Sequence, residues 1–233
     1  MATGQDHIAN NIAHFNELAA QYDGKPDRVE MGLESANAFL SHPSAKWNKD
    51  TTRCLDFACG TGLISAKLSE HAKSVTGVDL SDGMVGVYNG KAKLLAEKGQ
   101  HMKAFVVDIT EDEKGLDEWD FDVVVCALAY HHIENINHVT KCLAKRLKPG
   151  GALLISDLFK DSNAYKFHKQ EALKTLAHPE GMSSEIMKEA FEATGLLKDI
   201  KVQDAFTYTR KSNAPNSDEL VPFKFIIASG IRA

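Results

Sequence analysis

Apolar runs of five to ten residues alternate along the chain with segments in which apolar residues recur at helical spacing. Between the runs, the pattern predicts helices at 63–71, at about 82–97 and from Ile136, where Ile136, Val139, Leu143 and Leu147 share one face and residues 149–151 end the helix. Such alternation is typical of a parallel sheet covered by helices on both faces and joined by right-handed crossovers. The predicted strands are 54–58, 74–80, 102–109, 121–130 and 152–158.

The two ends of the chain follow other patterns. Amphipathic segments at 7–20 and 28–41 predict a helical cap over residues 1–46, in front of an α/β domain over residues 47–233. Residues 159–183 interrupt the alternation and are expected to form a helical insert, followed by a helix at 184–194. The last two strands, about 197–209 and 222–229, are joined by a polar loop and predict an antiparallel hairpin at the sheet edge. We therefore expect a Rossmann-like, seven-stranded, mostly parallel sheet.

Composition narrows the choice of partners. The 233 residues include 27 lysines and arginines and 32 aspartates and glutamates, which gives a net charge of −5. Proteins that bind nucleic acid are usually basic or carry a basic stripe, so we expect no nucleic-acid partner. The longest apolar run is too short to span a membrane, and the N-terminus lacks a secretory signal pattern. We expect a cytoplasmic protein, monomeric by default, with four buried free cysteines.

The segment LDFACGTG at 55–62 carries the clearest chemical signal. A predicted strand ends there in small residues, and a helix begins at once. Small residues let a ligand approach the backbone closely, and the bare amides of a helix N-terminus face such a ligand. In open α/β sheets, ligands bind beyond the carboxyl ends of the strands. The turn therefore predicts a nucleotide-type site.

Three acids at or near successive strand ends narrow the choice of ligand. Asp79 lies 17 residues after Gly62, where a carboxylate can bind the hydroxyls of a ribose. A dinucleotide site usually has a third glycine, but Ser65 stands at that position. Asp56 would repel a pyrophosphate and suits a cationic ligand. Together with Asp108, these residues favour an aminoacyl nucleoside with an ammonium and a sulfonium group over NAD.

With these motifs the chain resembles the class I S-adenosylmethionine-dependent methyltransferases, of the small-molecule type similar to ubiquinone and menaquinone methyltransferases. The resemblance covers about residues 50–230. It rests on five segments in the expected order: LDFACGTG, VTGVDLSDGM, the strand end at Asp108, DVVVCALAYHHI and LKPGGALLISD.

The resemblance implies S-adenosylmethionine as cofactor, S-adenosylhomocysteine as product, and a role for each matching residue. The Gly-rich turn would pack against the methionine part, with Asp56 near its ammonium; Asp79 would bind the ribose, Asp108 and Ile109 the adenine, with Leu80 and Met84 beside it. Cys126 would lie beneath the methyl group, and Tyr22 would close over the cofactor. The implied cofactor-binding residues are Tyr22, Asp56, Ala58, Cys59, Gly60, Gly62, Asp79, Leu80, Met84, Asp108, Ile109 and Cys126.

One position departs from the family pattern. The family usually has glycine where this chain has Ala58. Because alanine is unfavourable at positive φ, we expect a negative φ at this residue.

Methyl transfer from a sulfonium needs alignment of the reactants at ~3–3.5 Å and exclusion of water. Some acceptors also need a base, and His131 and His132, directly after the fourth strand, are the candidates, His131 ahead of His132. Helix capping by these histidines is the structural alternative.

We expect no metal site, because adjacent histidines without a second ligand cluster rarely form one. Aromatic residues that could line an acceptor pocket, or pack in the core, are Phe159, Tyr165, Phe167, Phe206 and Tyr208.

The predicted function is methyl transfer to a small organic acceptor, whose nucleophilic atom the sequence does not specify. Three alternatives remain open at this point: a protein or RNA methyltransferase of the same fold, an NAD-dependent oxidoreductase, and a non-catalytic cofactor-binding domain.

Overall fold

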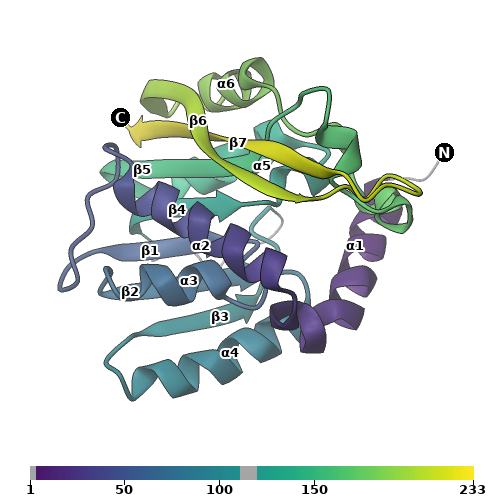
Figure 1. The fold of residues 1–233 in the computed structure, drawn as a ribbon. Coiled ribbons are helices and arrows are strands. Elements are labelled where there is room, and N and C mark those ends of the chain that lie inside the picture. The colour runs from purple at the N-terminus through teal and green to yellow at the C-terminus, as the bar shows by residue number, and fades with distance from the viewer. Residues whose placement is uncertain (1–3, 111–119) are drawn as a thin grey trace.

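A seven-stranded sheet of order β3-β2-β1-β4-β5-β7-β6 forms the centre of the computed structural model, which describes residues 4–110 and 120–233 (Figure 1). β7 runs antiparallel to both β5 and β6, and the remaining neighbours pair in parallel. The mostly parallel sheet with an antiparallel C-terminal hairpin is therefore confirmed. The strands are β1 (Arg53–Phe57), β2 (Ser74–Asp79), β3 (Met102–Val106), β4 (Phe121–Ala127), β5 (Leu147–Leu158), β6 (Leu197–Lys211) and β7 (Leu220–Arg232).

Helices cover both faces of the sheet, and a separate core cluster lies on each face. One cluster packs helices α2, α3 and α4 on one face, around Phe39, Leu68 and Tyr88. The other packs α5 and α6 on the opposite face, around Leu143 and Phe191. The α-helices are α1 (Gly4–Leu18), α2 (Pro26–Ser41), α3 (Leu63–Leu68), α4 (Asp82–Ala96), α5 (Ile136–Lys145) and α6 (Ser184–Glu192), and the 3₁₀ turns are η1 (Ala19–Gly24), η2 (Tyr130–His132), η3 (Ala164–Lys166) and η4 (Gln170–Thr175).

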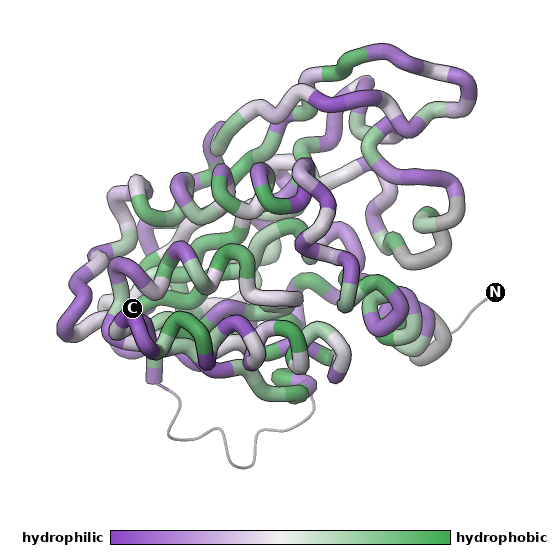
Figure 2. The backbone as a smooth tube through the Cα atoms, turned by 60° about the horizontal axis from the view of Figure 1, so that its bottom comes forward, coloured by the Kyte–Doolittle hydropathy of each residue, from purple (hydrophilic) through white to green (hydrophobic). Residues whose placement is uncertain are grey.

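The hydropathy of the chain follows these layers. Hydrophobic segments gather in the middle of the molecule, and hydrophilic ones lie in the outer loops (Figure 2). In β4, six of the seven residues are buried, as expected for a central parallel strand with helices on both faces. All four cysteines are buried free thiols, as predicted.

Several predicted boundaries were wrong. Leu147, expected on the face of α5, pairs with Phe121 in the sheet, because α5 ends at Lys145 and Arg146 already accepts a hydrogen bond from the Phe121 amide. Gly150, at a φ of +79°, lies within β5, which begins five residues earlier than the predicted strand. The segment 159–183 contains only the short turns η3 and η4. The boundary between a cap at 1–46 and a domain at 47–233 stays a prediction.

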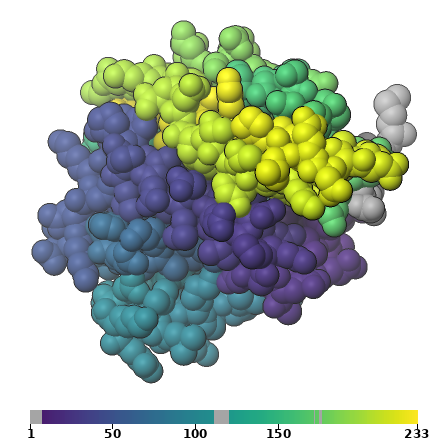
Figure 3. Space-filling model, viewed as in Figure 1, coloured from purple at the N-terminus to yellow at the C-terminus, as the bar shows by residue number. Residues whose placement is uncertain are grey.

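The N-terminal elements and the C-terminal hairpin meet at one end of the sheet. Helix α1 lies at the end to which β3 and β4 point (Figure 1). The ends of β6 and β7 reach the N-terminal elements (Figure 3), where the Tyr208 hydroxyl donates a hydrogen bond of 2.7 Å to Glu30 and the Arg210 side chain lies 3.5 Å from Asp27. These two contacts join the hairpin to α2, because Asp27 and Glu30 both belong to that helix.

Candidate functional site

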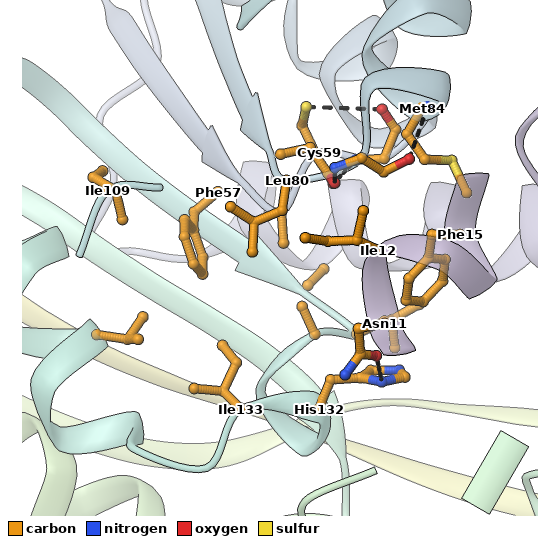
Figure 4. Close-up of a pocket in the computed structure, with 18 of the residues that line it drawn as sticks. Asn11, Ile12, Phe15, Phe57, Cys59, Leu80, Met84, Ile109, His132 and Ile133 are labelled. Carbon is orange, nitrogen blue, oxygen red and sulfur yellow. Dashed lines mark hydrogen bonds between the residues drawn. The ribbon is translucent and has the colours of Figure 1, made fainter. Parts of the chain in front are cut away.

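A cavity of about 370 Å³ lies between α1, η1 and the carboxyl ends of β1, β2 and β4 (Figure 4). Apolar side chains of α1 and of the strand ends form much of its wall, and charged side chains occur at a few points. Its lining includes Ile8, Asn11, Ile12, Phe15, Tyr22, Arg28, Phe57, Ala58, Cys59, Gly60, Thr61, Asp79, Leu80, Met84, Asp108, Ile109, Leu128, His132 and Ile133.

The two glycines of the turn after β1 have different functions. Gly60 has a φ of +52°, and a Cβ atom built on it would meet no protein atom within 4 Å, so its backbone borders the open cavity. Gly62 has a φ of +79°, and a Cβ there would lie 2.5 Å from the Tyr88 ring. Gly60 therefore leaves room for a ligand, whereas Gly62 leaves room for α4 and does not line the cavity.

The backbone conformation of Ala58 differs from the expected one. Its φ is +55°, not negative, so an alanine occupies the left-handed conformation that glycine adopts without strain. Leu128, at the end of β4, has a φ of +57°. Both residues line the cavity. Strained residues of this kind are often found at functional sites.

Asp79 is held in a fixed orientation at the end of β2. Its carboxylate accepts hydrogen bonds of 2.9 Å from the Gly60 and Ser81 amides, one on each oxygen. Burial raises the pKa of this carboxyl, while the amide bonds oppose the rise. No ion pair to Asp79 occurs within the described ranges, so its charge faces the cavity without a cationic partner.

Asp56 lies behind the turn and outside the cavity lining. It is 1% exposed, and the Ser65 hydroxyl donates to it at 2.6 Å. Burial raises its pKa to about 7. Asp56 was expected beside the ammonium of the ligand, but in the structure its carboxylate does not reach the cavity. It instead connects β1 to α3 through the hydrogen bond from Ser65.

The end of the cavity near β3 presents a second carboxylate. Asp108 Oδ1 accepts hydrogen bonds from the amide and hydroxyl of Thr110, at 2.9 and 2.6 Å. Ile109 is buried beside it, and Leu80 and Met84 line the wall that leads back to Asp79. Asp79 and Asp108 thus both line a cavity whose walls are largely apolar.

The cavity lining also contains a cation, Arg28, that the sequence motifs do not mark. The Arg28 guanidinium lies 4.1 Å from the centre of the Tyr22 ring. Its Nη1 atom is buried and has no hydrogen-bond partner among the described residues. Burial raises the pKa of Tyr22, and the charge on Arg28 opposes that rise. No motif marks Arg28, because its place over Tyr22 depends on the turn between η1 and α2.

The two candidate histidines point to different places. His132 lines the cavity, and its Nδ1 lies 2.9 Å from Asn11 Oδ1 of α1 (Figure 4). His131 is 2% exposed and does not line the cavity; its Nδ1 lies 2.6 Å from the buried Asp157. The ring of His168 packs 4.9 Å from that of His131, and burial lowers the pKa of His168 to about 3.

Most of the predicted ligand-binding residues lie around this one cavity. Those that line it are Tyr22, Ala58, Cys59, Gly60, Asp79, Leu80, Met84, Asp108 and Ile109. Asp56, Gly62 and Cys126 do not line it; Cys126 is fully buried in the core. None of the five proposed pocket aromatics lines it either. Phe167 and Phe206 instead pack against Phe225.

Comparison with known proteins gives a consistent result. Residues 33–198 match a family profile described as methyltransferase domain. An uncharacterised methyltransferase of Schizosaccharomyces pombe is 37% identical over 198 residues, which cover 81% of this chain and 70% of that protein. A ubiquinone biosynthesis O-methyltransferase of Dechloromonas aromatica is 36% identical over 119 residues, which are 49% of this chain and 48% of that protein.

A solved structure has the same fold at low sequence identity. It is the N-methyltransferase NodS of Bradyrhizobium japonicum in complex with S-adenosylhomocysteine, with a TM-score of 0.60 and 17% identity. The likeness covers 96% of this chain and 98% of that one.

Proposed function

Because this chain belongs to the class I S-adenosylmethionine-dependent methyltransferases, we propose that it transfers the cofactor's methyl group to a small, largely apolar acceptor without negative charge. S-adenosylhomocysteine is the product of that transfer. The observation that supports the proposal is the charge pattern of the cavity. Arg28, Asp79 and Asp108 line the cavity, and apolar side chains form much of the remaining wall.

The residues present fit S-adenosylmethionine. The buried Nη1 of Arg28 lacks a hydrogen-bond partner in the described part of the chain and suits a carboxylate. Asp79, oriented by two backbone amides, suits the hydroxyls of a ribose. The space in front of Gly60, where even a Cβ meets nothing, allows a ligand to touch the backbone. We propose that Arg28 and Tyr22 bind the methionine end and that Asp79, Leu80, Met84, Asp108 and Ile109 bind the adenosine.

The bound cofactor supplies a methyl group on a positively charged sulfur, which is a good leaving group. The protein then has to orient the acceptor and exclude water, which increases effective concentration. The apolar side chains of Ile12 and Phe15 in α1 cover the cavity, and we propose that they exclude water from it. In the described residues that line the cavity, Arg28 is the sole lysine or arginine. We infer from this an acceptor without negative charge, because a second anion would lack a cationic partner.

We assign acceptor contact to His132 rather than His131. His132 lines the cavity, whereas His131 is buried against Asp157. For an acceptor that loses a proton from a hydroxyl group, we propose His132 as the general base that accepts it. We expect His132→Ala to lower turnover of a hydroxyl acceptor at least a hundredfold while S-adenosylhomocysteine still binds. Methyl transfer to a panel of phenols measures this; near-normal turnover would contradict the assignment.

The first experiment is calorimetric titration of the purified protein with S-adenosylhomocysteine, with NAD in parallel. We expect micromolar binding of the former and no binding of NAD. Asp79→Ala should weaken binding about ten- to a hundredfold, because a charge-assisted hydrogen bond contributes about 1.5–3 kcal/mol. Arg28→Met, which keeps an unbranched apolar stem but removes the guanidinium charge, should weaken binding to a similar extent.

Asp50→Ala is the matched control for the loss of one carboxylate, because Asp50 is exposed and does not line the cavity. Wild-type affinity in both Asp79→Ala and Arg28→Met would contradict the proposed cofactor contacts. Acceptors are then screened as uncharged hydroxyl, amine and thiol compounds, with their carboxylated counterparts as the comparison.

A further inference from the structure

The cap helix α1 is hydrogen-bonded to the loop that follows Asp79. Asn16 Oδ1 accepts two hydrogen bonds, from the Ser81 hydroxyl at 2.5 Å and from the Gly83 amide at 3.1 Å. The Ser81 oxygen itself accepts from the Met84 amide at 3.1 Å, which caps α4. The Ser81 hydroxyl proton is therefore directed to Asn16, and one side-chain oxygen of α1 joins the first turn of α4.

Ser81 also connects this contact to the cofactor site. Its amide donates the 2.9 Å hydrogen bond that fixes Asp79 Oδ1. Ser81 is 1% exposed, so its backbone and hydroxyl have little freedom to reorient. The chain of contacts runs from Asn16 through both polar groups of Ser81 to the carboxylate of Asp79.

Gly83 provides a second, independent sign of close fit at the same place. A Cβ atom built on Gly83 would lie 3.2 Å from Asn16 Oδ1 and 3.3 Å from both the Ala19 Cβ and the Asn16 Cα. Contacts this short require a neighbour to move by a few tenths of an ångström. Glycine at this position thus allows α1 to approach α4 closely enough for the Gly83 amide to reach Asn16.

We propose that Asn16 is a positioning residue for cofactor binding, which acts through Ser81 on the orientation of Asp79. The inference rests on the proposed role of Asp79 in binding the ribose. Asn16 does not itself line the cavity. Because coupling between two sites is reciprocal, binding of S-adenosylhomocysteine also holds α1 in place over the cavity, where Ile12 and Phe15 cover the acceptor region.

The test is calorimetric titration of the full chain with S-adenosylhomocysteine. We expect Asn16→Ala to raise the Kd about three- to tenfold, since two hydrogen bonds of ordinary strength are lost and part of their effect reaches Asp79. Asn10→Ala, an exposed residue on the same helix, is the control and should keep wild-type affinity. Alanine is the better helix former at both positions, so a weaker helix cannot explain a loss seen only in Asn16→Ala.

Two further measurements separate positioning from general stability. Gly83→Ala should raise the Kd as Asn16→Ala does, with a thermal midpoint close to wild type. In an Asp79→Asn background, Asn16→Ala should change the Kd less than twofold, because the group that it orients has been altered. Hydrogen exchange of the α1 amides should slow on addition of S-adenosylhomocysteine in the wild type and not in Asn16→Ala.

These measurements distinguish a failure of the proposed function from a failure of the proposed role of Asn16. If the wild type does not bind S-adenosylhomocysteine, the proposed function is wrong. If Asp79→Ala binds it normally, the proposed ribose contact of Asp79 is wrong, and the role of Asn16 falls with it. If Asp79→Ala loses affinity but Asn16→Ala and Gly83→Ala both remain within twofold of wild type, the role of Asn16 is overturned and Asp79 keeps its own. A full effect of Asn16→Ala in the Asp79→Asn background also overturns it, because the effect then does not pass through Asp79.

Discussion

Single residues at the turn after β1 combine ligand access with backbone strain. Gly60 and Gly62 adopt positive φ angles that glycine accepts freely, and Ala58 adopts one that alanine does not. The strain at an alanine in this conformation is about 1–2 kcal/mol. Hydrogen bonds from the two residues that follow it, from the Cys59 amide to the Val78 carbonyl and from the Gly60 amide to Asp79, hold Ala58 in place. The tertiary structure thus imposes a conformation that the residue itself disfavours.

Ala58→Gly should therefore stabilise the protein. We expect the free energy of unfolding to rise by about 1 kcal/mol, because relief of strain exceeds the extra freedom that glycine gives the unfolded chain. Urea denaturation measures it, with Ala45→Gly, a buried alanine without a positive φ, as the control that should lose stability. Equal losses at both positions would refute the strain at Ala58.

Among the elements, the strands of the β6–β7 hairpin are longer than the other strands of the sheet. Their aromatic side chains form a packing cluster of their own. Phe225 is fully buried; its ring stacks on Phe206 at 4.5 Å and meets the edge of Phe167 at 5.8 Å. Through Tyr208 and Arg210 the hairpin also contacts α2. The aromatic residues of the insert and hairpin thus hold the cap in place, and core packing explains them better than an acceptor pocket does.

Phe225→Ala should destabilise this packing strongly. We expect a loss of about 3–5 kcal/mol in the free energy of unfolding, as is usual when a buried phenylalanine leaves a cavity. Tyr165→Ala is the matched control, because Tyr165 is 61% exposed and its loss should change stability by less than about 0.5 kcal/mol. Similar values for the two variants in chemical denaturation would argue against the packing role.

In the whole molecule, a buried acid makes stability depend on pH. Burial raises the pKa of Asp56 to about 7 in the folded chain, whereas the ordinary pKa of an aspartate side chain is 3.8. The folded state therefore binds more protons than the unfolded state between these values, and the free energy of unfolding falls as pH rises through this window. The fall is up to about 4 kcal/mol, at 1.36 kcal/mol per pKa unit.

Asp56→Asn should remove most of this dependence. We expect the wild type to lose stability between pH 5 and 8 and the variant to lose much less, because an amide does not ionise yet can still accept a hydrogen bond from Ser65. Thermal unfolding at several pH values measures this, with Asp122→Asn as a control at a partly exposed carboxylate. Parallel curves for wild type and Asp56→Asn would show that Asp56 does not titrate in this range.

The sequence by itself determined the sheet, its helices and most of the residues around the cavity. These follow from local patterns: apolar runs make buried strands, and small residues and acids stand at strand ends, which a parallel sheet brings to one edge. It did not determine which of two adjacent histidines faces the cavity, that Asp56 lies behind the turn, or that Arg28 and Asn16 come from the cap to meet the strand ends. Those depend on how α1 and α2 pack against the sheet. Contacts between segments far apart in the chain leave no periodic signal, and only the tertiary structure decides them.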